Sequence, residues 1–186
     1  LTALDEAVRA GKARAIGVSN ETPWGVMRFL GLATAGTGPR IAAIQNPYSF
    51  LNRSFEARLA EVAIREDCRL LAYAPLGAGT LTGKYLDDRR PPGARLTLWP
   101  DNRRYQGPRA EAAQRAYVEL ARAAGLDPAS MALAFATTRP FLTATIIGAT
   151  NLDQLATNIA AADMTLSPDV LDGIEDIHKV HTYPCP

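Results

Sequence analysis

Small and polar residues follow four short apolar runs of this sequence, and their side chains and amides could bind a small ligand. In chain order these residues are Ser19 and Asn20, Gln45 and Asn46, Tyr73, and Gly148 to Thr150. If the runs are neighbouring parallel strands, their carboxyl ends lie on one face, so we expect the polar groups to converge there. The alternative is that polar residues simply end buried strands, where turns need them. Four such sites together favour a binding face.

A glycine-rich stretch follows the third run, and such stretches often bind phosphate groups. The P-loop pattern fails here, because Ala78 stands where its first glycine belongs and Tyr85 where its Mg²⁺-binding hydroxyl belongs. The spacing of Gly77, Gly79 and Gly83 is one residue too long for the dinucleotide fingerprint G-x-G-x-x-G. Neither common phosphate motif explains the stretch.

Composition places the chain among ordinary globular proteins. Its 186 residues predict one domain, with 47% hydrophobic and 21% charged residues. A net charge of +1 does not favour nucleic-acid binding, and no apolar run approaches the roughly 20 residues that span a bilayer. Two cysteines, Cys68 and Cys185, do not make a disulfide framework, which favours a reducing, cytoplasmic location.

Apolar runs alternate with helical patterns along the chain. Predicted strands cover residues 13–18, 41–44, 69–72 and 144–147. Predicted helices cover residues 1–10, 22–33, 54–66 and 109–123 and begin again near residues 127, 150 and 167. Thr22, Asp127 and Ser167 each precede a proline and are predicted N-caps, and Thr150 with Asp153 predicts a capping box. This alternation favours a parallel sheet with right-handed crossovers.

Residues 73–108 are predicted to be irregular, with many Gly, Pro and Arg residues. A connection of this length inside a domain is usually functional or disordered. We expect Ile16, Val18 and Ile44 to lie on the inner faces of the strands. In a closed barrel, a layer of partner side chains would pack against these faces.

Four motifs closely resemble the aldo-keto reductase family and occur in the family's order. They are Ile-Gly-Val-Ser-Asn at residues 16–20, Ile-Gln-Asn-Pro-Tyr at 44–48, Tyr-Ala-Pro-Leu at 73–76 with Leu-Thr-Gly-Lys-Tyr at 81–85, and Gly-Ala-Thr at 148–150 with Gln154 and Asn158. Within the family the chain is most similar to the bacterial Tas-type reductases, through residues 45–54 and 181–184. The resemblance covers essentially the whole chain.

The resemblance implies an α/β fold, the C-terminal half (strands 5–8) of a parallel (β/α)8 TIM barrel. Residues 1–186 would be a single partial domain, and residues 73–108 a long loop that covers the cofactor. The chain opens inside a helical pattern at Leu1, so we expect it to be a fragment of a longer protein.

The resemblance also implies an NADP(H) site. Ser19, Asn20 and Gln45 would hold the nicotinamide carboxamide, and Tyr73 would stack on the nicotinamide ring. The other implied contacts are Ala74, Pro75, Leu76 and Gly77 for the pyrophosphate, Lys84 and Arg95 for the phosphate on the adenosine ribose, and Gly148, Thr150, Gln154 and Asn158 for that phosphate and the adenine. Ala74 departs from the family, where serine is frequent. No metal site is expected.

The family reduces carbonyls with an Asp, Tyr, Lys and His tetrad that follows strands of the barrel's first half. No residue here stands in those motif contexts, so no catalytic residue is assigned. The resemblance implies that the parent protein is an NADP-dependent oxidoreductase (EC 1.1.1 type) that transfers hydride between NADPH and an aldehyde or ketone. This chain would be its cofactor-binding half, inactive alone. The alternatives are a non-catalytic NADP-binding or assembly module, and a gene artefact with no separate function.

Several other residues have structural interpretations. His178 and His181 lie behind the last predicted helix, and solvent or packing roles are expected for both. Trp24 and Trp99 are expected to pack. Tyr48 either borders the substrate site or packs in the core. We expect a small carbonyl substrate, no nucleic-acid or membrane partner, and a homo-oligomer formed through open sheet edges.

Overall fold

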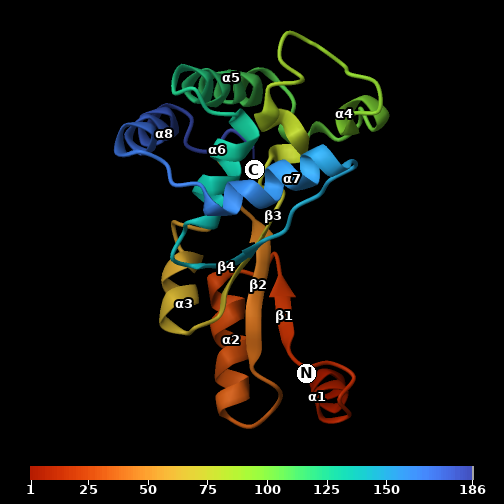
Figure 1. Ribbon diagram of the computed structural model, residues 1–186. Helices are drawn as coiled ribbons and strands as arrows, with labels where there is room; N and C mark the ends of the chain where they lie inside the picture. Colours follow the sequence, from red (N-terminus) through yellow and green to blue (C-terminus); the bar gives the residue numbers. More distant parts are fainter. Residues whose placement is uncertain (186) are drawn as a thin grey trace.

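Four parallel strands form the central sheet, in the order β1-β2-β3-β4 (Figure 1). The computed structural model describes residues 1–185. The strands are β1 (Ile16–Ser19), β2 (Ile41–Pro47), β3 (Arg69–Tyr73) and β4 (Leu142–Thr145). The predicted parallel sheet with helical crossovers is confirmed, and β1 and β4 are its two edges. Parallel strands end on the same side, so the residues after them gather at one edge of the sheet.

The strand boundaries differ from the prediction because pairing, not apolar content, defines them. β1 starts at Ile16 and not at residue 13, because Ile16 is the first residue that pairs with β2. β2 continues three residues further than predicted, because Pro47 still pairs with Tyr73. β4 lies two residues earlier than predicted and ends at Thr145.

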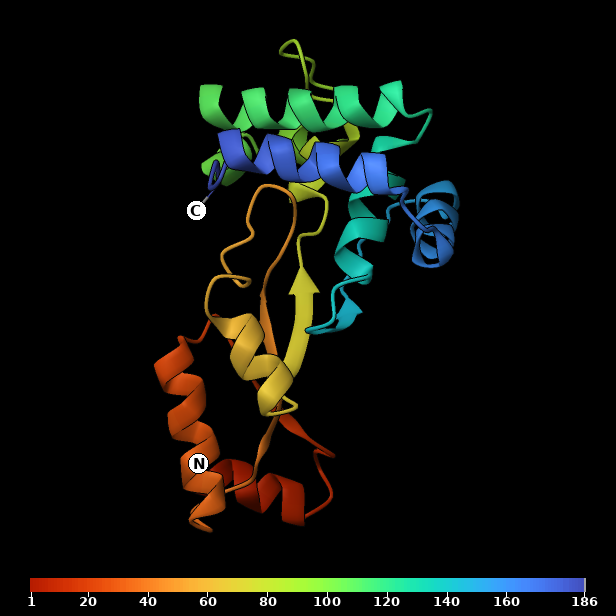
Figure 2. The same ribbon diagram turned by 90° about the vertical axis from the view of Figure 1, so that its left-hand side faces the viewer.

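Eight α-helices lie in the described part of the chain, residues 1–185. They are α1 (Thr2–Arg9), α2 (Pro23–Thr34), α3 (Leu59–Arg65), α4 (Arg95–Leu98), α5 (Pro108–Ala123), α6 (Pro128–Thr137), α7 (Leu152–Ala160) and α8 (Pro168–Val180). Short 3-10 helices are η1 (Gly77–Thr82), η2 (Arg103–Tyr105) and η3 (Ala161–Asp163). Figure 2 shows α2 and α3 along one side of the sheet and α5 and α8 side by side beyond the strand ends.

Three predicted N-caps are confirmed. The Thr22 hydroxyl accepts a hydrogen bond from the Gly25 amide at 3.1 Å, and the Asp127 carboxylate accepts one from the Ser130 amide at 2.8 Å. Ser167 caps α8 in the same way, with 3.4 Å from its hydroxyl to the amide nitrogen three residues on. A proline follows each cap at the first helical position, where its missing N–H costs nothing.

The N-terminus of α7 differs from the prediction. Asn151, not Thr150, is the N-cap, and its Oδ1 accepts a hydrogen bond from the Gln154 amide at 2.9 Å. The Gln154 side chain in turn accepts from the Thr150 amide at 2.9 Å. Gln154, not Asp153, therefore occupies the third helical position. Its side chain accepts from the amide of the residue that precedes the N-cap.

The predicted helix over residues 54–66 is wrong in its first five residues, since α3 begins at Leu59. The Asn52 side chain accepts hydrogen bonds from the Ser54 amide at 3.2 Å and from its hydroxyl at 2.7 Å. Such local side-chain contacts compete with helix formation, which explains the delayed start.

Each side of the sheet has a different environment, and the assignment of Ile16, Val18 and Ile44 to an open interior face is wrong. Ile44 is fully buried in the core, and Ile16 and Val18 pack against that core. The burial pattern of the strands places Gly17, Ser19, Gln45 and Leu71, which are more exposed, on the opposite face. Neighbouring residues of a strand point to opposite faces, so the exposed position of Ser19 and Gln45 places Val18 and Ile44 toward the helices.

Tyr48 belongs to the core, which settles the alternative between core and substrate site. Its side chain is fully buried, stacks near Phe135 at 6.3 Å between ring centroids and meets Phe141 edge-on at 5.3 Å. Trp24 and Trp99 do not pack in the core as expected, since they are 75% and 61% exposed. Within residues 1–185 no helix has the length and apolar character to cross a membrane.

Candidate functional site

Four predicted site residues come together where β1, β2 and β3 end. Ser19 pairs with Gln45 in the sheet, and the Asn20 amide donates to the Gln45 carbonyl oxygen at 3.0 Å. The Tyr73 hydroxyl donates to Asn20 Oδ1 at 2.8 Å, and Asn20 Nδ2 donates to Ser19 Oγ at 3.1 Å. Ser19, Asn20 and Gln45 are exposed and Tyr73 is half-buried. The cluster therefore presents hydroxyl and amide groups to solvent from three adjacent strands.

The backbone after β3 turns through several left-handed residues. Ala74 and Ala78 have φ values of 53° and 58°, and Gly77 and Gly79 have 53° and 88°. A left-handed alanine costs about 1–2 kcal/mol, so two of them within five residues mark a loop held in an unusual shape. At Gly77 an added Cβ would lie 2.9 Å from Leu51 Cδ1, so the close packing also requires glycine there.

Successive amides of such a turn form concave surfaces that suit anions. Pro75 and Gly77 are buried, while Ala74 and Leu76 are half-buried, so the loop lies against the body of the protein. Residues 74–77 carry no polar side chain, so the hydrogen-bonding groups that they offer belong to the backbone.

Lys84 and Arg95, the two predicted phosphate-binding cations, lie in the same loop region but in different local environments. The Lys84 ammonium lies 5.3 Å from the Tyr85 ring centroid, and an added Cβ at Gly79 would be 3.1 Å from Lys84 Nζ. Arg95 is exposed at the first position of α4. Within residues 1–185, neither cation has an ion-pair partner.

The last group of predicted residues forms its own hydrogen-bonded unit at the start of α7. Gln154 accepts from the Thr150 amide and, at 3.1 Å, from the Thr150 hydroxyl. Asn158 is buried, and its Nδ2 lies 3.4 Å from the Gly148 carbonyl oxygen, to which it donates. β4 leads to this unit, and the Ile146 amide donates to the Ala72 carbonyl oxygen of β3 at 2.7 Å.

The segment of residues 73–108 is less irregular than predicted. It contains η1, α4 and η2, and side chains anchor it at several points. The Tyr85 hydroxyl accepts from the Leu96 amide at 3.0 Å, and Gln114 Nε2 donates to the Tyr105 carbonyl oxygen at 2.8 Å. The segment is therefore folded, with an internal contact between Tyr85 and Leu96 and an attachment to α5 through Gln114.

Arg104, in η2, is a residue that the sequence analysis missed. Its guanidinium interacts with the hydroxyl of Tyr73, and this interaction raises the pKa of Arg104. The loop after β3 is rich in arginines, so residue type alone did not single out the one beside Tyr73. The next residue, Tyr105, lies close to Gly77, so this part of the segment is packed beside the loop that follows β3.

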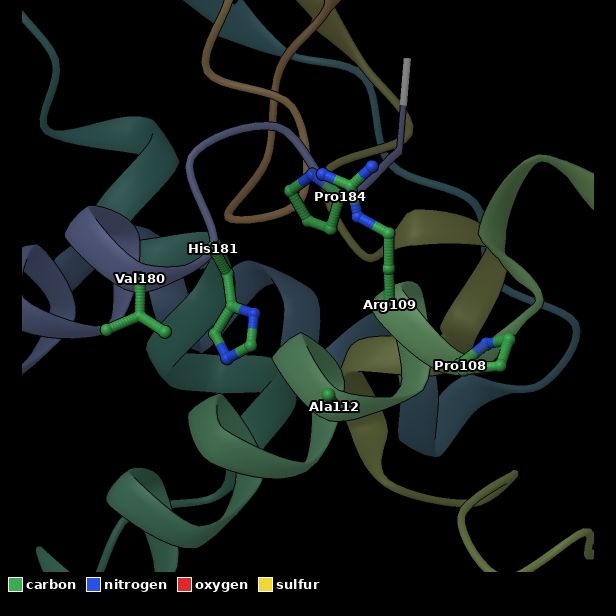
Figure 3. A pocket seen from close by; sticks show the side chains of 6 residues that line it. All are labelled: Pro108, Arg109, Ala112, Val180, His181 and Pro184. Carbon is green, nitrogen blue, oxygen red and sulfur yellow. The ribbon is translucent and has the colours of Figure 1, made fainter.

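Two surface hollows differ in their relation to these residues. One, of about 370 Å³, lies on the open face of the sheet and is lined by Gly17, Ser19, Ala43, Gln45 and Leu71 among others. The other, of about 260 Å³, lies between the start of α5 and the C-terminal tail, with Arg109 and His181 in its wall (Figure 3). Only the first contains predicted site residues.

An ionic cluster around the buried Arg53 links the segment between β2 and α3 to α8. Arg53 donates to both Glu56 oxygens, at 2.9 and 2.8 Å, and lies 2.9 Å from Glu175 of α8; Tyr48 donates to Glu56. Burial alone would lower the pKa of Arg53, but hydrogen bonds to both carboxylates raise it. Burial and the nearby Glu56 raise the pKa of Tyr48, so its hydroxyl stays protonated.

The two histidines lie at α8, away from the strand ends. His178 is half-buried within α8, and His181 follows its last turn. Burial, together with the positive charge of Arg53, lowers the pKa of His178. Residues 1–185 contain no group of acidic, histidine or cysteine side chains arranged to hold a metal ion.

Comparison with known proteins places this architecture in a family. The family model described as "Aldo/keto reductase family" matches residues 1–179. The chain is 58% identical to protein Tas of Escherichia coli over its whole length, which is 54% of Tas. It is 36% identical to an aldo-keto reductase of Babesia bovis over 97% of this chain and 65% of that protein.

A third relative, the uncharacterized oxidoreductase YrpG of Bacillus subtilis, is 30% identical over 94% of this chain and 52% of that protein. The chain thus spans roughly half to two thirds of the length of these relatives. Together with the parallel sheet and its helical crossovers, the match over residues 1–179 shows that the chain belongs to the aldo/keto reductase family, with Tas among its relatives.

Proposed function

We propose that the protein is the cofactor-binding part of an NADP(H)-dependent oxidoreductase that transfers hydride between NADPH and an aldehyde or ketone. The observation that carries this proposal is the cluster of Ser19, Asn20, Gln45 and Tyr73 at adjacent strand ends, in a chain of a reductase family. When bound, NADPH supplies the hydride. The residues of this chain bind and orient the cofactor.

The donor and acceptor groups of this cluster fit a primary carboxamide. A carboxamide is planar, with one acceptor oxygen and two donor hydrogens, and hydroxyl and amide side chains complement both. Ser19 and Asn20 supply donors for the oxygen, and the exposed Gln45 supplies an acceptor for the hydrogens. The half-buried Tyr73 ring offers a flat apolar surface for the nicotinamide.

The remaining residues fit the phosphate groups and adenine. The left-handed turn over residues 74–79 offers backbone amides to a pyrophosphate. Lys84 and Arg95 supply cations without ion-pair partners among residues 1–185, and a 2′-phosphate would attract both. The start of α7, with Gly148, Thr150, Gln154 and Asn158, would bind the same phosphate and the adenine.

We further propose that the four strands are strands 5–8 of a barrel that the chain alone does not close. The proton donor for the carbonyl would then come from outside this chain, and the isolated chain would bind cofactor without turnover. The second candidate, a non-catalytic NADP-binding or assembly module, is favoured by the placement of both histidines on or after α8 rather than after a strand.

Location and partners belong to the same proposal. We assign the protein to the cytoplasm because both cysteines are free and buried. A small carbonyl compound is the expected substrate of the parent enzyme, and the two unpaired sheet edges favour self-association.

Calorimetric titration of the 186-residue chain with NADPH, joined to a reductase assay with a reactive aldehyde, tests the proposal. Saturable NADPH binding without turnover is the expected result. Turnover above background would refute the assignment as a cofactor half. Absence of NADPH binding would refute the function itself.

A further inference from the structure

The hydroxyl of Tyr73 makes a contact that a phenylalanine or tryptophan ring could not make. It donates to Asn20 Oδ1 at 2.8 Å, while Asn20 Nδ2 donates to Ser19 Oγ at 3.1 Å. The Asn20 side-chain amide is therefore held at both ends, with its oxygen toward Tyr73 and its nitrogen toward Ser19.

These two hydrogen bonds are what orients the amide. Asn20 is exposed, so packing does not select between the two orientations of its side chain. Its backbone is fixed separately, because the main-chain N–H donates to Gln45 and φ is 55°. Arg104, which can only donate, also interacts with the Tyr73 hydroxyl, so the single hydroxyl hydrogen is left for Asn20.

The orientation determines what the cluster offers a ligand. With Asn20 Oδ1 engaged, one Nδ2 hydrogen is given to Ser19 and the other is free to donate. The Ser19 oxygen already accepts, so its own hydrogen is also free to donate. Two donors then remain for a ligand, which suits a single acceptor such as a carboxamide oxygen.

We propose that Tyr73 is a positioning residue whose hydroxyl orients the Asn20 amide, so that Asn20 and Ser19 both donate to the carboxamide of the cofactor. This role rests on the proposed function and is separate from stacking of the Tyr73 ring. It acts through Asn20 and predicts a specific pattern of losses on mutation.

The variant Tyr73→Phe removes the hydroxyl and keeps the ring. Titration of the 186-residue chain with NADPH should show about a fivefold rise in Kd, the effect of one hydrogen bond. The probe 2′-phospho-ADP-ribose lacks nicotinamide, and its Kd should stay within about twofold of the wild-type value. Tyr183→Phe, at an exposed tyrosine of the tail, is the matched control and should change neither affinity.

A double-mutant cycle with Asn20→Ala separates this role from a structural one. In the Asn20→Ala background, Tyr73→Phe should cause no further loss of NADPH affinity, because the group that it orients is gone. An equal fivefold loss in both backgrounds would overturn the proposal, as would a parallel loss of 2′-phospho-ADP-ribose affinity. Unchanged NADPH affinity in Tyr73→Phe would overturn it and leave the proposed function standing. Failure of the wild-type chain to bind NADPH would overturn both.

Discussion

At the scale of single residues, the proposed site assigns the preference for NADP(H) over NAD(H) to Lys84. Its ammonium lies beside Gly79 and the Tyr85 ring, with no carboxylate partner among residues 1–185. A charge-assisted hydrogen bond to the 2′-phosphate would contribute on the order of 1.5 kcal/mol, about tenfold in Kd. Lys84→Met should therefore weaken NADPH binding about tenfold and leave NADH binding nearly unchanged.

Parallel titrations with both dinucleotides check this prediction. Lys179→Met, at an exposed lysine of α8 that pairs with Asp176, is the control and should leave both affinities unchanged. An equal loss of affinity for NADPH and NADH in Lys84→Met would show that Lys84 does not bind the 2′-phosphate.

In the proposed site, the Tyr73 ring contributes to NADPH binding in addition to its hydroxyl. Tyr73→Ala should weaken NADPH binding by the contribution of the hydroxyl and, in addition, by roughly 1 kcal/mol of ring stacking. NADPH affinity should therefore fall further in Tyr73→Ala than in Tyr73→Phe. Identical dissociation constants for the two variants would show that the ring does not contact the cofactor.

Helix caps are the feature that the sequence predicted best at the scale of elements. Asp127 accepts from both the amide and the hydroxyl of Ser130 at the start of α6, whose residues from Ala129 to Ala136 are all buried. Asp127→Ala should lower the free energy of unfolding by about 1 kcal/mol. Urea unfolding measures this loss, with Glu119→Ala on the exposed face of α5 as the control. A loss no larger than that of the control would contradict the capping role.

His178 should make the packing of α8 sensitive to acid. Burial and Arg53 lower its pKa below the ordinary value of 6.5, while Glu56 and Glu175 partly offset them. Because the folded state favours the neutral imidazole, this contribution to stability is complete above about pH 6.5. It is lost as the pH falls below that value and the unfolded chain takes up the proton.

Urea unfolding of the wild type and of His178→Gln between pH 7.5 and pH 5 measures the effect. The wild type should lose more stability across this range than His178→Gln. Parallel pH profiles for the two proteins would show that His178 does not titrate differently on folding.

The sequence predicted the elements more reliably than their ends. Helices that begin with a Ser, Thr or Asp before proline are determined locally, and they begin where predicted. β4 and the start of α3 depend on partners distant in sequence or on the Asn52 side chain, and both predictions shifted. Ile44 was assigned to the wrong face because an alternating pattern gives two faces without saying which one the helices cover.

The site was predictable where it lies next to a strand. Ser19, Gln45 and Tyr73 follow from the strand ends. The sheet register places Ser19 opposite Gln45 and Tyr73 opposite Pro47, two residues further along β2. The hydrogen bond between Tyr73 and Asn20 was not predictable, because it joins side chains 53 residues apart at the ends of different strands. The placement of Arg104 was not predictable, because it depends on how the segment after β3 folds.

The open sheet determines the behaviour expected of the whole molecule. β1 and β4 each leave one edge unpaired, and Ile146, Ile147, Leu152 and Ile159 near the β4 edge are exposed apolar residues. Such edges and apolar surface favour association. Size-exclusion chromatography with light scattering should therefore give a mass above that of the monomer. A monomeric mass with cooperative unfolding would contradict this expectation.

The most direct test of the account is the position of the cofactor on the sheet. Amide chemical shifts of the isotope-labelled 186-residue chain, recorded during titration with NADPH, report that position residue by residue. We predict saturable shifts at the strand ends and their loops, namely Ser19, Asn20, Gln45, Tyr73, Gly77, Lys84, Gly148 and Thr150. Shifts confined to the hollow near Arg109 and His181, or no saturable shifts, would contradict the central claim that the carboxyl ends of β1 to β4 form an NADP(H) site.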